Sequence, residues 1–187
     1  MMNRQTLLTR IVRWLLLALI LFVLGMAGLK VLCPFPYREA INRWTGEYST
    51  DQFLVAAVIR AESHFRTHAT SSAGAIGLMQ IMPTTGEWIA GKIGMDGFTV
   101  DDLYDSETNI RLGVWYMRYL IDRFGDIDTA LAAYNAGPRN VRRWHDTEEE
   151  AFAETTEFVR KVRKGEREYR FLYTLPILGS LFRALPL

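Results

Sequence analysis

An uncharged apolar run close to the N-terminus constrains the fold of this chain more than any other feature. Residues 14–29 carry no charge and are nearly all apolar. The run extends to Cys33 if the long side chain of Lys30 reaches towards the lipid headgroups. It is then about 20 residues long, roughly the length that a helix needs to cross the hydrocarbon core of a bilayer. The sequence therefore predicts one transmembrane helix over residues 14–33.

Basic residues on both sides of this run orient it only weakly. They are Arg4, Arg10 and Arg13 before it, and Lys30, Arg38 and Arg43 after it. The charge asymmetry that usually orients a membrane helix is therefore small. Because the run lies so near the N-terminus, we expect residues 1–13 to form a short cytoplasmic segment. Residues 34–187 are then outside the cytoplasm, in a single-pass protein of the cell membrane.

A cleaved signal peptide is the alternative to an anchor. Gly25 and Ala27 are small residues, placed after a basic segment as a cleavage site would need. We favour an uncleaved anchor because the apolar run continues past Ala27. Lipid modification of Cys33 is a weaker alternative, since the bulky Leu32 precedes it.

Length, charge and cysteine content narrow the classes of function. A chain of 187 residues is long enough for one domain and an appendage. The formal net charge of +1 gives no basic surplus that would favour nucleic acid as a partner. A single cysteine excludes internal disulfides and cysteine-based metal clusters, and the three histidines lack zinc-site spacing. We therefore expect neither a metal nor a cofactor.

The region after residue 33 has mainly helical patterns, so we expect a mainly α domain. Ser49 with Gln52 predicts a capping box, and Asp128 predicts another N-cap. Glycines between residues 91 and 97 mark a loop with room for a small hairpin. An apolar tail over residues 170–187 packs on the domain or touches the membrane surface. The predicted helices are residues 37–44, 49–63, 83–90, 106–124, 131–136, 141–144 and 148–164.

One glutamate interrupts an apolar face of the helix predicted over residues 49–63. Leu54, Val58, Glu62 and Phe65 follow one another at spacings of four, four and three residues, so they share a face. A carboxylic acid kept away from water can hold its proton near neutral pH and can protonate a leaving-group oxygen. A glycine-rich turn at residues 77–80 follows, where a substrate can approach the backbone closely. Glu62 is therefore the candidate general acid.

Several short motifs in a fixed order resemble one known family. They are Glu62-Ser63-His64-Phe65, Ser71, Gly74-Ala75, Gly77-Leu78-Met79-Gln80-Ile81-Met82-Pro83-Thr84 and Ala133-Tyr134-Asn135-Ala136-Gly137. Together they resemble the soluble-lytic-transglycosylase (SLT) domain of the lysozyme-like superfamily, over roughly residues 37–173. The resemblance implies that residues 34–187 form a lysozyme-like helical catalytic domain with an apolar C-terminal tail, and that this domain faces the cell wall. It also implies cleavage of the β-1,4 bond between N-acetylmuramic acid and N-acetylglucosamine in peptidoglycan, leaving 1,6-anhydromuramic ends.

The resemblance also implies a set of site residues. It places Met79 and Gln80 beside the acid in contact with sugar, and it returns Tyr134 and Asn135 to the same site. The Tyr134 hydroxyl is then expected to orient Glu62 or the N-acetyl group of the substrate. The full set of substrate-binding residues that the family match implies is Ser71, Gly77, Leu78, Met79, Gln80, Tyr134, Asn135 and Glu154.

A late motif departs from the family pattern. The family has Glu-Thr-Arg-x-Tyr-Val, whereas this chain has Glu154-Thr155-Thr156-Glu157-Phe158-Val159. Contacts that the arginine and tyrosine make in relatives are therefore in doubt here, although Glu154 is retained. Thr67 stands where many relatives have proline, which is a minor loop change.

The sequence around Glu62 suits a mechanism that uses one carboxylic acid. Residues 63–86 contain neither aspartate nor glutamate, whereas most glycosidases use two carboxylates. Glu62 would protonate the glycosidic oxygen, the substrate's N-acetyl group would stabilise the developing cation, and Glu62 would then take the proton of the attacking C6 hydroxyl. Two alternatives remain open: a hydrolytic muramidase resembling goose-type lysozymes, and a non-catalytic wall-binding scaffold.

Overall fold

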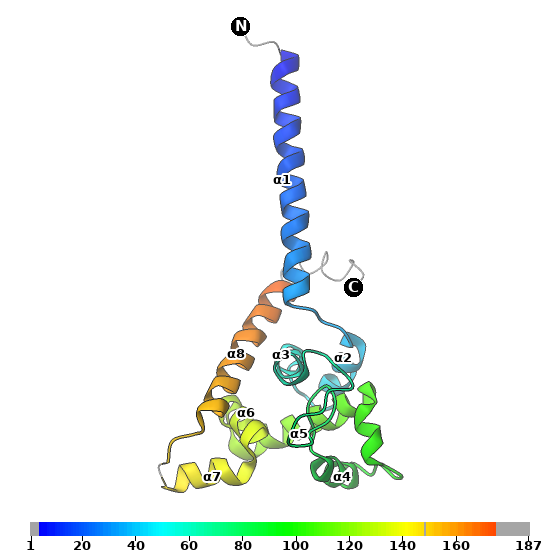
Figure 1. Ribbon diagram of the computed structural model, residues 1–187, viewed down its shortest axis with the longest axis vertical. Helices are drawn as coiled ribbons and strands as arrows, with labels where there is room; N and C mark the ends of the chain where they lie inside the picture. Colours follow the sequence, from blue (N-terminus) through cyan, green and yellow to red (C-terminus); the bar gives the residue numbers. More distant parts are fainter. Residues whose placement is uncertain (1–3, 148, 175–187) are drawn as a thin grey trace. The chain divides into compact units, whose positions relative to one another are not determined.

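The computed structural model is mainly α-helical and describes residues 4–147 and 149–174 (Figure 1). It divides into two compact units, one formed by residues 1–34 and 172–187 and a larger one formed by residues 35–171. The expectation of a mainly α fold is confirmed. In the described part of the chain the elements are α1 (Arg4–Leu32), α2 (Arg38–Glu47), α3 (Gln52–Ser63), α4 (Pro83–Lys92), the 3-10 helix η1 (Val100–Tyr104), α5 (Ser106–Phe124), α6 (Ile127–Ala136), α7 (Pro138–Thr147) and α8 (Ala153–Thr174).

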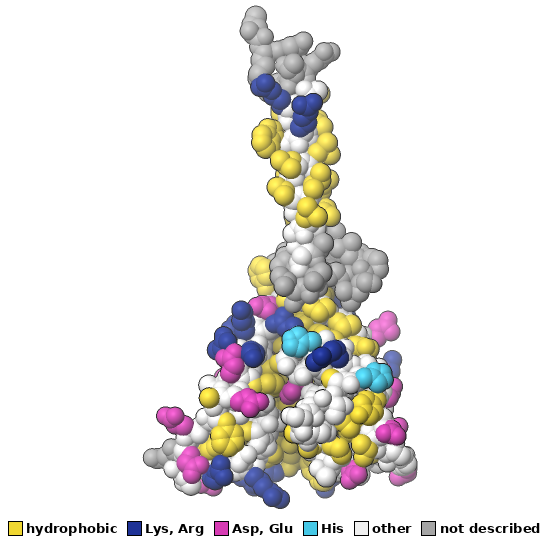
Figure 2. Space-filling model, in the orientation of Figure 1, with side chains coloured by type: hydrophobic (Ala, Val, Ile, Leu, Met, Phe, Trp, Pro, Cys, Tyr) yellow, Lys and Arg dark blue, Asp and Glu magenta, His cyan; other side chains and the backbone are white. Residues whose placement is uncertain are grey.

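The N-terminal helix α1 is long and apolar enough to cross a membrane. The best 18-residue segment, Leu8–Gly25, lies within it, and none of that segment is buried inside the protein. Figure 2 shows hydrophobic side chains around this helix and basic side chains near its N-terminal end. A signal sequence has the same length and composition, so α1 fits either an anchor or a signal.

Helix α3 forms the centre of the larger unit because it is apolar on nearly every side. All seven residues from Phe53 to Ile59 are buried, which is typical of a helix that neighbours cover all round. Figure 1 shows α3 almost end-on, with α8 on one side and α2 on the other. Gly165 allows α8 to approach closely, since an added Cβ there would lie 3.2 Å from the Cβ of Ala57. The end of α3 is therefore held firmly by its surroundings.

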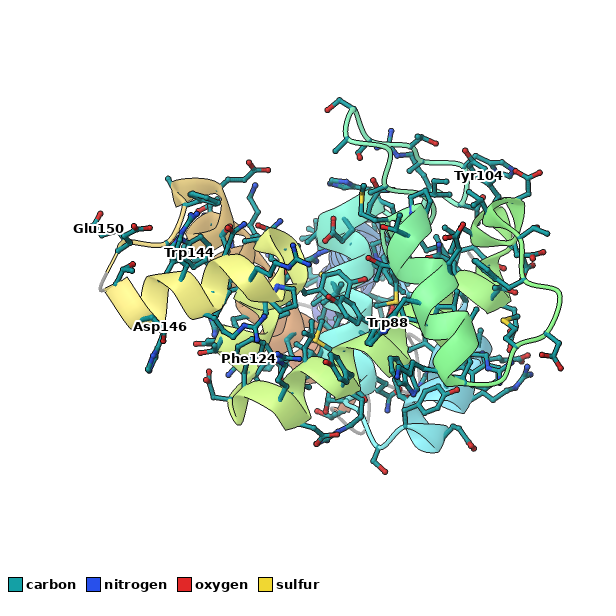
Figure 3. All side chains as sticks on the ribbon, turned by 90° about the horizontal axis from the view of Figure 1, so that it is seen from below. Trp88, Tyr104, Phe124, Trp144, Asp146 and Glu150 are labelled. Carbon is teal, nitrogen blue, oxygen red and sulfur yellow. The ribbon has the colours of Figure 1, made fainter. Side chains whose placement is uncertain are left out.

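Helix α5 connects the remaining helices, since it packs against α2, α4, η1 and α6. Its C-terminal half contributes Leu120 to a core cluster that also contains residues of α6 and α7. Trp144 of α7 belongs to this cluster, and Figure 3 shows it with Phe124 of α5 in a view from below. The Trp144 ring also packs edge-on against Phe152, with 4.9 Å between the ring centroids. Helices α5, α6 and α7 therefore pack together around this shared cluster.

Two predicted helix caps are wrong. Helix α3 is capped by Asp51, whose carboxylate accepts hydrogen bonds from the amides of Phe53 and Leu54 at 2.8 and 3.0 Å. Ser49 lies outside the helix, in a turn with φ 50°. Helix α6 begins earlier than predicted, because Asp126, and not Asp128, caps it through the amide of Thr129. In both places a second polar residue competes with the true cap, and the sequence pattern selects the wrong one.

Other boundaries also differ from the predictions. Helix α8 begins at Ala153 and continues to Thr174, instead of covering residues 148–164. The first buried side chain of this helix is Thr155, so the acidic residues before it have no apolar face to pack. Isolated antiparallel bridges pair Thr70 with Ile76 and Ile76 with Ile81, whereas residues 91–97 form no strand in the structure described. The apolar tail over residues 175–187 lies outside the described residues.

Candidate active site

Glu62 lies in the last turn of α3, at the point where the chain turns sharply away. Helix α3 ends because His64 and Phe65 both adopt left-handed backbone conformations, with φ 52° and 61°. Such conformations are unusual for residues with bulky side chains and are found preferentially at functional sites. The buried Ser63 hydroxyl donates to the Leu78 carbonyl at 2.7 Å, which ties this helix end to the glycine-rich loop. Glu62 is thus held at a rigid junction.

Burial changes the acidity of Glu62. Removal of its carboxylate from water, together with the smaller effect of the negative charge of Glu154, raises the pKa of Glu62 from 4.5 to about 7. At neutral pH the protonated and ionised forms are therefore both well populated. A group with this pKa can donate a proton and later accept one, which is the requirement for a general acid that also acts as the base.

The buried side chain of Asn109, on α5, holds the loop at residues 77–80 from the side of that helix. Its amide nitrogen donates to the carbonyls of Ile76 and Leu103, at 3.0 and 2.8 Å. Its side-chain oxygen accepts from the amide of Met79 at 2.8 Å. Three buried backbone groups are thereby satisfied, each of which would be costly to leave unpaired. Asn109 thus sets the position of the loop relative to α5.

Two glycines make this close packing possible. Gly77 has φ 80°, and an added Cβ would lie 2.2 Å from the Asn109 side chain and 2.4 Å from the Leu103 carbonyl oxygen. Gly113, one turn further along α5, leaves space for Met79, whose sulfur would lie 2.3 Å from an added Cβ. Leu78 and Met79 are therefore fully buried. Their side chains pack in the core and do not reach an open surface, so any contribution that they make to binding comes through loop shape.

Gln80, Tyr134 and Asn135 line a cavity of about 280 Å³. The side-chain amide of Gln80 donates to the carbonyls of Ala69 and Gly77 at 3.2 and 2.8 Å. Asn135 accepts a hydrogen bond from Thr155 of α8 at 2.8 Å. The structure thus brings together three of the predicted binding residues from two distant parts of the sequence.

The Tyr134 hydroxyl has a different partner from the expected one. It donates to the Met79 carbonyl at 2.6 Å, and so it connects α6 to the glycine-rich loop. Burial raises the pKa of Tyr134 well above its usual value, and the nearby charge of Glu62 raises it further. The hydroxyl therefore stays protonated as a donor. The charge of Glu62 thus acts on a residue that belongs to the wall of this cavity.

Two further predicted residues differ in their surroundings. Ser71 is in the loop before the glycine-rich turn, where its hydroxyl accepts from the amide of Ala75 at 3.0 Å. This hydrogen bond shapes the loop. Glu154 is exposed at the start of α8, and its charge acts on Glu62. The structure therefore adds a second carboxylate to the surroundings of Glu62, which the sequence near residue 62 did not indicate.

A family model described as the transglycosylase SLT domain matches residues 39–156. The chain belongs to this SLT family. The soluble lytic murein transglycosylase of Escherichia coli (strain K12) is 33% identical over an alignment of 151 residues, which covers 74% of this chain and 23% of that protein. Membrane-bound lytic murein transglycosylase C of Histophilus somni (strain 2336) is 31% identical over an alignment of 152 residues, which covers 74% of this chain and 40% of that protein.

The fold of this SLT chain also matches a solved member. The crystal structure of the 70 kDa soluble lytic transglycosylase from Escherichia coli superposes with a TM-score of 0.73 at 30% sequence identity. The match covers 81% of this chain and 26% of the other. The chain therefore spans only part of the length of the relatives that it resembles, between about a quarter and two fifths.

The late motif of this SLT domain shows how the departures from the family pattern are accommodated. Thr156 is exposed and its hydroxyl bonds the Phe152 carbonyl at 3.4 Å, whereas Phe158 is buried in the domain. Thr156 lacks the charge of the family's arginine, and Phe158 lacks the hydroxyl of its tyrosine. Thr155 instead gives this segment a direct hydrogen bond to the site, through Asn135.

Sequence reasoning missed Asn109, Ser63 and Thr155 as supports of the site. A recognisable signal exists for Asn109, because it lies next to Ile110 at the start of the apolar stripe of α5 and is four residues before Gly113. A polar residue buried on an apolar face usually satisfies backbone groups. The two hydroxyl residues carry no comparable signal, since serine and threonine are common near helix ends.

No group of three or more histidine, cysteine, aspartate or glutamate side chains is placed to hold a metal ion within residues 4–147 and 149–174.

Proposed function

We propose that this SLT chain is a peptidoglycan lytic transglycosylase that cleaves the β-1,4 bond between N-acetylmuramic acid and N-acetylglucosamine. The observation that carries the proposal is the pKa of about 7 at Glu62, in a chain of the SLT family. Protonated Glu62 donates to the glycosidic oxygen, and the substrate's N-acetyl group stabilises the positive charge that develops at C1. Ionised Glu62 then accepts the proton of the C6 hydroxyl as this oxygen bonds to C1, which forms the 1,6-anhydro ring.

The surrounding residues are assigned supporting roles in this proposal. Gln80, Tyr134 and Asn135 form the wall of the cavity beside the acid and bind the sugar. Gly77, Leu78 and Met79 give the loop its shape, while Ser71 fixes the preceding turn. Glu154 keeps the pKa of Glu62 high.

The product distinguishes this proposal from the hydrolytic alternative. We expect digestion of purified peptidoglycan to give fragments with 1,6-anhydromuramic ends. Such fragments are lighter than fragments with reducing ends by the mass of one water molecule, because the nucleophile is a hydroxyl of the substrate and no water is added. Mass spectrometry of the released fragments makes the measurement. Reducing muramic ends alone would show a muramidase, and no release at all would favour a wall-binding scaffold.

The hydrolytic alternative has one specific observation in its favour, which is the charge of Glu154 close to Glu62. A second carboxylate could hold a water molecule as the base of an inverting hydrolase. Replacement of Glu154 by glutamine separates its two possible roles. If Glu154 only raises the pKa of Glu62, the variant keeps its turnover at acidic pH.

The Glu154→Gln variant should also change the dependence of activity on pH. Glu62 must be protonated to act as an acid, so kcat/KM of the wild type should fall as pH rises above about 7. Removal of the Glu154 charge lowers the pKa of Glu62, and the fall should then begin at lower pH. Glu157→Gln, on the same helix, is the control that leaves the profile unchanged. A collapse of turnover at every pH in Glu154→Gln would instead assign Glu154 a catalytic role.

We further propose that α1 anchors the enzyme in the cell membrane with the SLT domain facing the cell wall. Support comes from the apolar segment Leu8–Gly25 and from the continuation of α1 to Leu32. Intact-mass measurement of the chain extracted from membranes tests this. A mass that includes the whole of α1 supports the anchor, and the loss of a segment that ends near Ala27 shows a cleaved signal.

A further inference from the structure

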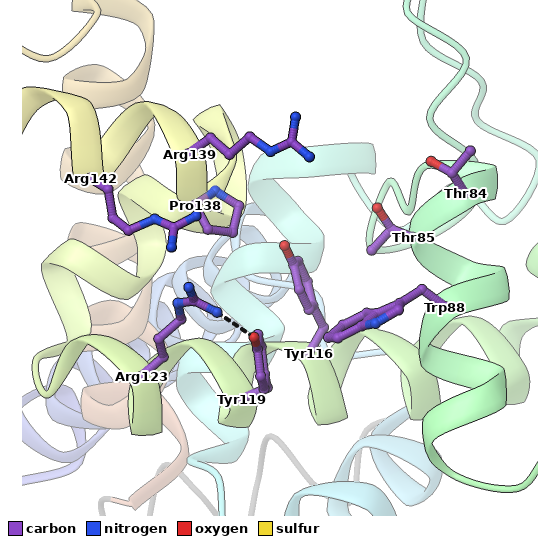
Figure 4. Close-up of a pocket in the computed structure, with 9 residues that line it drawn as sticks. All are labelled: Thr84, Thr85, Trp88, Tyr116, Tyr119, Arg123, Pro138, Arg139 and Arg142. Carbon is purple, nitrogen blue, oxygen red and sulfur yellow. Dashed lines mark hydrogen bonds between the residues drawn. The ribbon is translucent and has the colours of Figure 1, made fainter.

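A second cavity adjoins the one beside the acid and has a different character. Its volume is about 390 Å³, and it shares Thr85, Tyr116 and Pro138 with the first cavity. Figure 4 shows its walls, with α4 on one side, the start of α7 on the other and the side chains of α5 between them. A ligand that occupies the first cavity can therefore extend into the second without leaving the surface.

Three arginines and no carboxylates line this second cavity. Arg123 comes from the end of α5, while Arg139 and Arg142 come from the first turns of α7. Figure 4 shows Arg139 extending across the space towards α4. The cavity is therefore positively charged. The N-terminal end of α7 adds to this, because the aligned peptide dipoles of a helix place a partial positive charge at its start.

The arginines of the cavity are not neutralised by ion pairs in the part of the chain that the structure describes. The adjacent Arg143 pairs with Glu149 at 3.2 Å, whereas no described carboxylate lies within ion-pair distance of Arg139 or Arg142. Asp126 and Asp146 line a neighbouring cavity with Arg123 and Arg142, but the Asp126 carboxylate is engaged by the amide of Thr129. Unpaired guanidinium groups gathered in a cavity are suited to binding an anionic group.

Aromatic rings form the floor of the same cavity. The Trp88 and Tyr119 rings meet edge-on with 5.2 Å between centroids, and Tyr116 adjoins both of them. Trp88 is 39% exposed, which is high for a tryptophan that only packs in a core. Arg123 donates to the Tyr119 hydroxyl at 2.5 Å, so its guanidinium is held in place beside the ring. The cavity combines an amphipathic floor, on which a sugar ring can lie, with a basic wall.

We propose that this cavity binds a carboxylate-bearing part of the glycan strand, so that the enzyme favours charged strands over uncharged ones. This inference rests on the proposed function, because it concerns the same substrate. The carboxylate has two possible sources. In strands without peptides it is the lactyl group of muramic acid, and in strands with peptides it is the stem peptide, since the lactyl group is then part of an amide.

The test uses the full chain and a double variant, Arg139→Gln with Arg142→Gln. Both residues are exposed, and glutamine retains much of the length of the side chain without its charge. We expect KM for the recognised strand type to rise about tenfold, which corresponds to the loss of one or two charge-assisted hydrogen bonds at an exposed site, while kcat changes little. Parallel measurements with peptide-bearing and peptide-free strands identify the source of the carboxylate. Arg143→Gln, on the same helix but outside the cavity, is the matched control.

Binding measurements keep this test independent of catalysis. In a Glu62→Gln background, the double variant should lose affinity for the charged strand and retain its affinity for an uncharged chitin oligosaccharide. Added salt should weaken the affinity of the Glu62→Gln protein for the charged strand. It should weaken the affinity of the protein that also carries the double variant much less. Unchanged affinity for both charged strand types, or an equal loss for the chitin oligosaccharide, would overturn the inference. Absence of anhydro ends with wild-type protein would reject the proposed function instead, and these binding results would still decide the role of the arginines.

Discussion

Replacement of Glu62 by glutamine is expected to abolish cleavage of peptidoglycan and to leave binding intact. Glutamine has nearly the same shape but cannot donate or accept the proton that both steps require. Loss of a group that acts as general acid and then as base should reduce turnover by about 10³-fold or more. Release of soluble fragments from peptidoglycan measures turnover, and co-sedimentation with insoluble peptidoglycan measures binding. Glu47→Gln, exposed at the end of α2, is the control.

The Glu62→Gln variant should also show how much the raised pKa of Glu62 lowers the free energy of unfolding at neutral and alkaline pH. The folded pKa of about 7 exceeds the ordinary value of 4.5, so the unfolded chain ionises first as pH rises. The wild type therefore loses stability between about pH 4.5 and 7, and glutamine does not. At pH 8 the thermal midpoint of Glu62→Gln should equal or exceed that of the wild type. Cleavage that survives the substitution, or a lower midpoint at pH 8, contradicts the role given to Glu62.

Replacement of Gly77 by alanine is expected to destabilise the domain strongly. The added Cβ would lie 2.2 Å from the buried side chain of Asn109 and 2.4 Å from the Leu103 carbonyl oxygen, and neither can move without breaking a hydrogen bond. The left-handed backbone adds about 1–2 kcal/mol. Together these effects should cost about 3 kcal/mol or more, which lowers the thermal midpoint by about 6–12 °C in a domain of this size.

Gly74→Ala is the matched control for this prediction. Gly74 also has a positive φ, of 86°, but nothing lies within 4 Å of an added Cβ. Its replacement should therefore show only the backbone contribution, about 1–2 kcal/mol. Thermal unfolding of the two variants, followed by circular dichroism in the same detergent, compares them directly. Equal midpoints for both variants would show that the loop moves aside and that Asn109 does not fix it.

Helical periodicity predicts most of the helices of this fold. It does not predict those helix boundaries that depend on long-range contacts. Helix α5 was predicted at its observed limits because a strong apolar stripe ends at Gly125, which adopts the left-handed conformation. Helix α8 was placed wrongly because the acidic run at residues 148–150 resembles a helix start. Its actual start follows the packing of Thr155 and Phe158, and such contacts cannot be seen in a local pattern.

The candidate site shows the same division between local and distant information. Glu62 was found from an interruption in an apolar stripe, which is a local feature of the sequence. The influence of Glu154 is an electrostatic effect between residues that are 92 positions apart. That of Asn109 depends on hydrogen bonds to the loop before α4 and to η1 after it. The Tyr134 hydroxyl is expected to orient Glu62 or the N-acetyl group of the substrate, and in the structure it donates to the Met79 carbonyl. Motifs therefore indicate which residues belong to the site, but they do not show which groups those residues contact.

Helix α5 also sets the spacing between the loop near the acid and the basic cavity. Asn109, Gly113, Tyr116 and Arg123 recur on one face of this helix, so the residue that fixes the loop near the acid and a basic residue of the second cavity belong to one rigid element. They are 14 positions apart, which corresponds to about 21 Å along a helix. Under both proposals, α5 therefore keeps a fixed spacing between the loop near the acid and the basic cavity, so the cut falls at a set distance from a charged group of the strand.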